Sequence, residues 1–431
     1  MGSSFLPKKT QTTPRGESEK SRKLLNVGFD TGVSRCVTIR SMNNFFDMLF
    51  GPISSMASVD IIKMVIMWAL SGALIYLAIK KGMEPSLLLP MGFGSIMVNL
   101  PFSGAITQEI EGMTEHGPLS VLFDAGIANE LFPLILFIGI GAMIDFGPVL
   151  SNPKMLLFSV MAHLGVFLTI ILAVAISPLM PQEYSFSLQD AVAVGIIGAA
   201  DGPTAIFVAN YYQTNYMGAI LVAAYSYMAL VPIIQPPCIK LVTTKRERLI
   251  RMPYANTDAS QSVRILFPIV VTVIAGLVAP RAVGLVGFLM FGNLLRECGV
   301  LKNLSDTAQN ALANIITILL SLTVAVKMQA EYFLNPLTLF IMALGLFAFV
   351  ADTIGGVLFV KLMNLFLKEK INPMIGACGI SAFPMSARVV HKMGLAEDPK
   401  NHLLMHAAGA NVGGQVASVI VGGLLLSLVA R

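Results

Sequence analysis

Long apolar segments, separated by short polar ones, make up most of this 431-residue chain. They lie near residues 60–79, 86–100, 131–146, 154–178, 188–212, 216–241, 263–279, 283–296, 310–326, 336–366, 371–391 and 403–429. A helix needs about 20 apolar residues to span a bilayer, with a range of about 17–25. The pattern therefore predicts an all-α, polytopic (multi-pass) membrane protein embedded in a lipid bilayer.

Gly and Pro interrupt two of these segments, 188–212 and 371–391. The first contains Gly195-Ile-Ile-Gly-Ala-Ala-Asp201-Gly202-Pro203-Thr204, and the second runs from Asn372-Pro-Met-Ile-Gly376 to Ser381-Ala-Phe-Pro-Met-Ser-Ala-Arg388. Because Pro lacks an N–H and disfavours helical geometry in the residue before it, each helix must break. Broken backbone at membrane depth is tolerated only inside protein or beside a wet cavity. We therefore expect each segment to be a re-entrant or broken helical hairpin.

The polar stretch 242–262 divides the membrane region into two halves. Residues 42–250 form a first repeat with the Asp201 hairpin, and residues 251–431 form a second repeat with the Asn372–Arg388 hairpin. If each hairpin returns to its own side, each half crosses the membrane five times, and an odd number makes the repeats inverted. Interrupted segments at corresponding positions of two halves are typical of a transporter-type binding site.

The positive charges of the loops give this topology an orientation. Loops 80–85, 147–154, 240–264, 296–305, 361–370 and 392–402 carry 16 Lys or Arg, whereas the opposite loops and the C-terminus carry only Arg281, Lys327 and Arg431. Because cytoplasmic loops are enriched in Lys and Arg, the first set is predicted to face the cytoplasm. The Asp201 hairpin then enters from outside, the second hairpin enters from the cytoplasm, and their tips meet near the midplane.

Composition narrows the function classes further. Only 12% of the residues are charged, against about 25% in soluble domains. Residues 1–41 hold eight Lys or Arg and three Asp or Glu, and they begin Met-Gly-Ser-Ser, as an artificial leader does. We expect a disordered basic tail there, with Met42 a second plausible start and no nucleic acid as partner. The four cysteines are far apart, so no transition-metal site is predicted, and no ATP-binding loop motif is present.

Asp201 is the candidate centre of the chemistry. An ionisable side chain in the membrane interior is costly and indicates function by default. Carboxylate, hydroxyl and amide oxygens suit a small hard cation, and Asp201, Thr204, Asn372 and Ser381 supply that set. The alternative is that Asp201 only caps the helix after a turn, since Asp before Gly-Pro is common turn chemistry. In an apolar segment mirrored by a second interruption, we favour ion binding.

Other polar residues have weaker signals. Arg388 presents a planar fork that matches a carboxylate, although an arginine at a helix end also extends towards the membrane surface without further function. Tyr227 is able to donate a hydrogen bond or relay a proton, but we favour an interfacial or helix-packing role, which is the usual one for such a tyrosine. Asn411 and Gln415 stand one helical turn apart among glycines, and we interpret them as packing residues.

The two interrupted segments resemble the beta subunit of the biotin-dependent, sodium-pumping decarboxylases, which include oxaloacetate, methylmalonyl-CoA and glutaconyl-CoA decarboxylases. The resemblance extends from about Met42 to the C-terminus. It implies that Asp201, Asn372, Ser381 and Thr204 bind Na⁺, that Tyr227 and Ser381 lie near biotin or on the proton path, and that Arg388 holds the carboxylate of carboxybiotin. Gly202, Pro203 and Gly376 would shape the site backbone.

The resemblance also implies a mechanism and partners. A biotin-carrying carboxyltransferase alpha subunit would deliver carboxybiotin, and this chain would decarboxylate it, consume a proton and drive Na⁺ outward across the bacterial cell membrane. A homotrimeric beta core and a small single-span gamma or delta subunit are expected. The competing hypothesis is a Na⁺- or H⁺-coupled secondary transporter of an organic anion, which would suit two inverted halves equally well.

Overall fold

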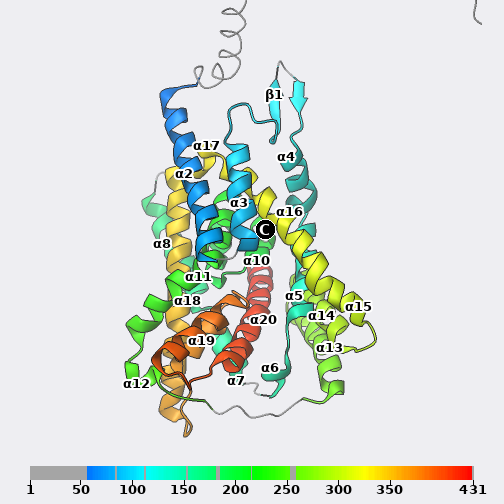
Figure 1. Cartoon of the computed structure of the whole chain (residues 1–431), viewed down its shortest axis with the longest axis vertical. Coiled ribbons are helices and arrows are strands. Elements are labelled where there is room, and N and C mark those ends of the chain that lie inside the picture. The colour runs from blue at the N-terminus through cyan, green and yellow to red at the C-terminus, as the bar shows by residue number, and fades with distance from the viewer. Residues whose placement is uncertain are drawn as a thin grey trace, which may run out of the picture. The chain divides into compact units, whose positions relative to one another are not determined.

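A computed structural model describes residues 56–429, apart from 83–84, 111–112, 152–153, 181–184, 215 and 253–258. The predicted basic tail, residues 1–41, lies outside the described residues. The described chain is helical almost throughout, which confirms the all-α prediction (Figure 1). Its one sheet is a small antiparallel pair, β1 (Gln108–Ile110) and β2 (Met113–Glu115), in which Gln108 faces Glu115.

The first half of the chain contains helices that pack in pairs and helices that are broken into shorter pieces. In chain order its helical elements are α2 (Ser58–Lys81), α3 (Pro85–Val98), α4 (Pro118–Phe123), η1 (Asp124–Ala128), α5 (Leu131–Met143), α6 (Gly147–Ser151), α7 (Lys154–Met161), α8 (Leu164–Ile176), η2 (Ser177–Leu179), α9 (Leu188–Gly195), η4 (Ile196–Ala199), α10 (Gly202–Tyr211) and α11 (Met217–Val242).

The second half follows with a similar alternation. Its elements are α12 (Lys245–Arg248), α13 (Gln261–Val278), η5 (Pro280–Ala282), α14 (Val283–Glu297), α15 (Lys302–Asp306), η6 (Thr307–Leu312), α16 (Ala313–Val324), η7 (Ala325–Met328), α17 (Ala330–Phe333), α18 (Pro336–Phe366), η8 (Pro373–Gly379), α19 (Met385–Glu397) and α20 (Leu404–Leu428). A π-helical turn precedes α5 in one half and α16 in the other. The inverted relation of the halves, and the division at residue 250, stay predictions.

The expected ten crossings are only partly matched by long helices. Among the described residues, six helices are long and apolar enough to span a membrane, or eight if two bent pairs each count as one span. Other expected crossings correspond to shorter helices: α3 has 14 residues, which reach about 21 Å, less than the ~30 Å apolar core. One bent pair is α11, which turns by 69° between Met228 and Leu230. Pro232 explains this bend, because its ring clashes with the carbonyl four residues earlier.

Helix α20 runs between the two hairpins and shows that they open towards opposite ends of it. At its start, Asn401 and Asn372 both donate to the carbonyl of Arg248 at 3.0 Å. At its far end, the hydroxyl of Tyr212, just after α10, donates to the carbonyls of Leu425 and Val429. The second hairpin therefore begins at the end of α20 next to the basic segment, and the first hairpin ends at the opposite one.

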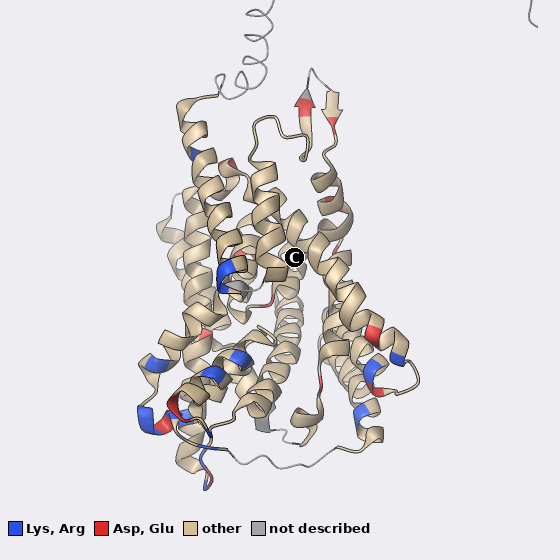
Figure 2. Ribbon diagram, viewed as in Figure 1, with Lys and Arg blue, Asp and Glu red and all other residues tan. Residues whose placement is uncertain are grey.

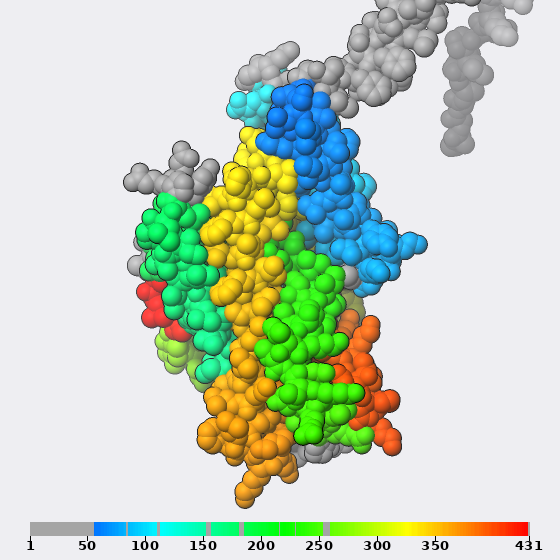
Figure 3. Space-filling model, turned by 90° about the vertical axis from the view of Figure 1, so that its left-hand side faces the viewer, coloured from blue at the N-terminus to red at the C-terminus, as the bar shows by residue number. Residues whose placement is uncertain are grey.

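Charge follows the same axis. Figure 2 shows Lys and Arg gathered around α12, α19 and the ends of α14 and α15, while β1 and β2 at the other end carry acidic residues. Figure 3 shows the face on which the long helix α18 lies between α8 and α11. The outer residues of such helices are large and apolar, for example Leu358 and Leu362, as expected of surface in contact with lipid.

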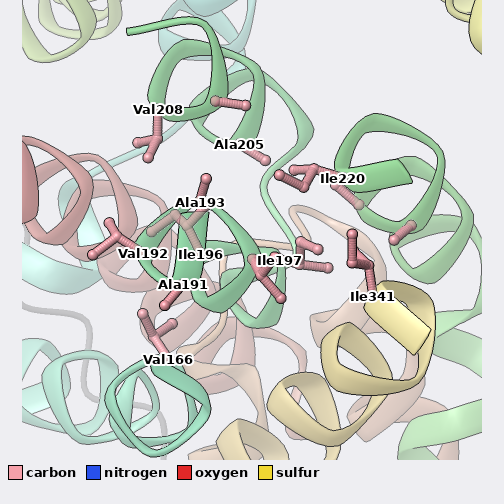
Figure 4. Close-up of a cluster of buried hydrophobic side chains, with 14 of the residues drawn as sticks. Val166, Ala191, Val192, Ala193, Ile196, Ile197, Ala205, Val208, Ile220 and Ile341 are labelled. Atoms are coloured by element: carbon pink, nitrogen blue, oxygen red, sulfur yellow. The ribbon is translucent and has the colours of Figure 1, made fainter. Parts of the chain in front are cut away.

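The first hairpin is packed into an apolar cluster drawn from several helices. Figure 4 shows Ile196 and Ile197 of η4 among Val166 of α8, Ile220 of α11 and Ile341 of α18. All these side chains have essentially no exposed surface. This packing fixes the position of the hairpin arm. It accounts for the apolar side chains of the arm but not for the polar atoms at its tip.

Candidate functional site

The tip of the first hairpin is a turn between two short helices. A capping box of Ser187 and Asp190 starts α9, which passes into the 3₁₀ turn η4. Ala200 then adopts a left-handed conformation (φ 52°), and Asp201 is extended (φ −123°). A left-handed residue other than Gly costs about 1–2 kcal/mol, so the surrounding contacts must hold the turn. Gly202 and Pro203 then begin α10, where the missing N–H of Pro costs nothing.

The carboxylate of Asp201 is buried and accepts hydrogen bonds from two sides. Its Oδ2 accepts from the hydroxyl of Thr204 at 2.6 Å, the hydroxyl of Ser418 at 2.7 Å and the amide of Gln415 at 3.2 Å. Its Oδ1 accepts from the backbone N–H of Thr204 at 3.5 Å. Asp201 therefore does cap α10, as the alternative interpretation expects, but its other oxygen collects three side-chain donors that capping does not need.

The second hairpin reaches the first through its backbone. Asn372 caps η8 by accepting from the N–H of Met374 at 3.1 Å. Gly376 lies so close to α18 that a Cβ there would be 2.1 Å from the carbonyl oxygen of Gly356. At the end of η8, the N–H of Ser381 donates to the carbonyl of Ala199 at 3.0 Å. The prediction that the two tips meet is confirmed.

Helix α20 holds both tips together along one face. Asn411 donates to the carbonyl of Ile380 at 2.7 Å, and Gln415 and Ser418 donate to Asp201. Between them, Gly414 allows the carbonyls of Gly379 and Ile380 to approach closely. Residues 411, 415 and 418 share a helix face because they follow the 3.6-residue period. Gln415, which we interpreted as a packing residue, joins α20 to the first tip through its buried amide, and a role beyond packing is not tested by this contact.

Several buried oxygens beside the tips have no partner. In the part of the chain that the structure describes, the hydroxyls of Ser381 and Tyr225 and the Oδ1 of Asn411 make no hydrogen bond. The Ser381 hydroxyl nevertheless lies close to the Asp201 carboxylate, and the ring of Tyr225 lies against Gly202. Buried polar atoms are rarely left unpaired without reason. A carboxylate with hydroxyl and amide oxygens is a donor set that fits Na⁺ as a transported substrate.

Asn372 and Tyr227 lie outside this cluster of Asp201, Thr204, Ser381, Gln415 and Ser418. Asn372 donates its amide to the carbonyls of Arg248 and Ile250, at the opposite end of η8 from Ser381. Tyr227 donates its hydroxyl to the carbonyl of Met342 on α18. The structure does not bring either side chain into contact with Asp201, and their expected roles stay predictions.

Arg388 differs from Arg248 and Arg251, two arginines that pair with the end of α19. Arg248 and Arg251 are each 2.6 Å from an acidic oxygen, of Glu397 and Asp398 respectively. Arg388, on α19, is exposed, and its guanidinium has no ion pair or hydrogen bond among the described residues. A guanidinium without a protein partner is available to a carboxylate ligand from outside the chain.

Sequence reasoning missed Ser418, Tyr225 and Asp352. Asp352 is a second fully buried carboxylate, on α18, and its position in an apolar segment is the same signal that singled out Asp201. Ser418 could have been found because it stands seven residues after Asn411, on the same helix face. Tyr225 gave no such signal, because nothing in its neighbourhood in the sequence distinguishes it from Tyr227.

Comparison with known proteins identifies the family to which the chain belongs. The sequence model of a family described as the Na⁺-transporting oxaloacetate decarboxylase beta subunit matches residues 63–429. The oxaloacetate decarboxylase beta chain of Klebsiella pneumoniae is 43% identical over 412 residues, covering 84% of this chain and 94% of that one. The methylmalonyl-CoA decarboxylase subunit beta of Propionigenium modestum is 46% identical over 382 residues (84% and 94%).

The glutaconyl-CoA decarboxylase subunit beta of Acidaminococcus fermentans is also 46% identical, over 356 residues (83% of this chain and 90% of that one). The three relatives differ in the acid that their names specify, yet each covers more than four fifths of this chain. All three relatives are beta subunits. The chain belongs to the family of Na⁺-transporting decarboxylase beta subunits, multi-pass proteins of the bacterial membrane.

Proposed function

We propose that this chain decarboxylates carboxybiotin delivered by a partner subunit and couples the reaction to outward Na⁺ transport with consumption of a proton. The observation that carries the proposal is the buried Asp201 carboxylate at the contact of two hairpin tips. An ionised carboxylate at this depth requires a cation, and Na⁺ and H⁺ are alternative occupants of the same oxygen. Family membership supports the chemistry that drives their exchange.

The partners follow from the same proposal. Biotin would be carried by a carboxyltransferase alpha subunit on the cytoplasmic side, where Arg388 would hold the carboxylate of the arriving group. Cleavage of the N–CO₂ bond releases CO₂ and leaves an electron pair on the ureido nitrogen, which takes up one proton. A homotrimeric core of this chain and a small single-span gamma or delta subunit complete the proposed assembly.

The residues have separate roles in this proposal. Asp201, Thr204 and Ser381 would hold Na⁺ at the tips, with Asn372 at the cytoplasmic end of η8 as a ligand in another conformation. Tyr227 and Ser381 would lie on the proton path. Because the Ser381 N–H donates to the Ala199 carbonyl, a movement of one tip would displace the other. This main-chain contact is the proposed link between biotin chemistry on one side and ion exchange on the other.

The test is CO₂ release from free carboxybiotin by the assembled complex in liposomes. We expect release to depend on Na⁺, Asp201→Asn to abolish that dependence, and Asp190→Asn to retain it. Asp190 is the matched control, because it lies in the same hairpin but at the start of α9, where it is half-buried and caps the helix. Transport of an organic anion without CO₂ release would instead favour the secondary-transporter hypothesis.

A further inference from the structure

Asp352 is a second carboxylate in the interior of the membrane region, and the site described above does not use it. It lies on α18, which packs between α8 and α11 (Figure 3), and none of its surface is exposed. Capping or packing alone is served as well by Asn, Ser or Thr, which do not carry the cost of an ionisable group. The burial of an acid at this position therefore indicates a role for its ionisable group.

One oxygen of Asp352 is held by the start of a helix. The membrane segment that contains α7 and α8 breaks at Ala162 and His163, and the first N–H groups of α8 are left without partners inside the helix. Asp352 Oδ1 accepts from the N–H of Gly165 at 2.5 Å and from that of Val166 at 3.3 Å. These two donors satisfy Oδ1 fully.

The other oxygen has no donor at all. Asp352 Oδ2 is buried and makes no hydrogen bond with any described residue. It lies against Gly198 in the arm of the first hairpin, where a Cβ would be 2.6 Å from it. An unpaired ionised oxygen in such surroundings costs several kcal/mol, which a bound cation or proton would remove. Gly198 is three residues before Asp201, so this oxygen contacts the same arm that carries the ion site.

Helix α18 also contacts the second hairpin one turn further on. A Cβ on Gly356 would be 2.2 Å from the carbonyl oxygen of Gly376 in η8. Asp352 therefore lies between the contacts that α18 makes with the two hairpins. Any shift of the first arm against α18 would change the surroundings of Oδ2, because Gly198 lies against it.

We propose that Asp352 is a second proton-carrying site, protonated in the conformation described here and ionised when the first hairpin arm withdraws Gly198 from it. The carboxylic acid then releases its proton to water and becomes a carboxylate. A proton fits better than Na⁺, because a small cation needs several oxygen ligands and no hydroxyl or amide of the described residues is hydrogen-bonded to Oδ2. The inference rests on the proposed ion exchange at the tips.

The charges around Asp352 are compatible with a neutral acid. Helix α8, η4 and η8 contain no Lys or Arg. The titratable groups on the elements packed against this part of α18 are Lys154 in α7, His163 before α8, Asp190 at the start of α9, Asp201 after η4, Cys378 in η8, Tyr225, Tyr227, Cys238 and Lys240 in α11, and Lys361 at the far end of α18 itself. Lys361 is already bonded to the carbonyl of Val242 and paired with Glu247 at 3.1 Å, so it does not neutralise Asp352.

The test is infrared difference spectroscopy of the complete complex in liposomes, with and without Na⁺. Carboxylic acids that lose or gain a proton give C=O stretching bands. We expect Asp352→Asn to remove one such band and Asp201→Asn to remove another. The matched control is Thr353→Val, at the neighbouring buried position of α18, which should leave both bands in place.

The outcomes separate this inference from the proposed function. A spectrum in which only Asp201→Asn loses a band overturns the role of Asp352 and leaves Na⁺/H⁺ exchange at Asp201 standing. A spectrum in which neither variant loses a band overturns both. Should Asp352→Asn fail to assemble, Gly198→Ala replaces it, because the added methyl group presses on Oδ2 and should shift the Asp352 band; an unshifted band contradicts the inference.

Discussion

The backbone N–H of Ser381 donates to the carbonyl of Ala199 at 3.0 Å, which joins the tips of two hairpins that open towards opposite ends of α20. Asp201 follows Ala199 by two residues, and the unpartnered hydroxyl of Ser381 lies close to its carboxylate. The proposed ion site therefore lies at the contact between the hairpins. From this arrangement we predict the effects of substituting single residues that contact it.

Ser418 should matter to Na⁺ binding although it lies outside both hairpins. Its hydroxyl donates to Asp201 Oδ2 at 2.7 Å, and a hydrogen bond to a charged group contributes about 1.5–3 kcal/mol. Ser418→Ala should make ionised Asp201 less favourable, so protons compete better with Na⁺. We expect the half-saturating Na⁺ concentration of decarboxylation to rise by about tenfold. Ser427→Ala, on the same helix, removes only a bond to the carbonyl of Gly423 and should leave it unchanged.

The two tyrosines of α11 should respond differently to loss of the hydroxyl. Tyr225 has a buried hydroxyl without a partner, so Tyr225→Phe should leave thermal stability unchanged and weaken Na⁺ binding. Tyr227→Phe should lower stability by about 1 kcal/mol, because the carbonyl of Met342 loses its donor. Thermal unfolding and Na⁺ titration of each purified complex measure both effects. An unaltered Na⁺ titration curve for Tyr225→Phe would remove Tyr225 from the site.

Arg388 should affect substrate recognition without affecting folding. It is exposed and forms no ion pair in the described chain, so Arg388→Gln should leave thermal stability unchanged. If it holds a carboxylate, the KM for carboxybiotin should rise by about tenfold or more. Arg388→Lys should be intermediate, since an ammonium lacks the planar fork. Lys392→Gln, an exposed change one turn along α19, is the control. An equal rise in KM for Lys392→Gln would show that Arg388 contributes only to the general surface charge.

Gly414 should be essential for the contact between α20 and the second tip. A Cβ there would lie 2.4 Å from the carbonyl oxygen of Ile380 and 2.5 Å from that of Gly379. Gly414→Ala should therefore push the tip away and cost about 1–3 kcal/mol of stability, with loss of Na⁺ dependence. The control is Gly72→Ala in α2, where no atom lies within 4 Å of the added methyl group. Equal thermal stabilities for the two variants would show that the close approach is not required.

The sequence located the hairpins but not the full set of residues around them. Gly-Pro and Asn-Pro in apolar segments identify broken helices, and Asp201 stands out because a charge is costly there. The same rule applies to Asp352, which sequence reasoning passed over in the long apolar segment 336–366. The spacing of Asn411, Gln415 and Ser418 places them on one face of α20, but a helical period does not identify the partner of that face.

The sequence by itself determined that this is an all-α, multi-pass membrane protein with two interrupted segments, because hydropathy and backbone chemistry act locally along the chain. Only the tertiary structure decided which groups complete the site: it brought Ser418 and Gln415 to Asp201, placed Asn372 and Tyr227 elsewhere, and set Asp352 against Gly198. The physical reason is that the cost of a buried polar group depends on its neighbours in space, and those neighbours come from helices far apart in the sequence.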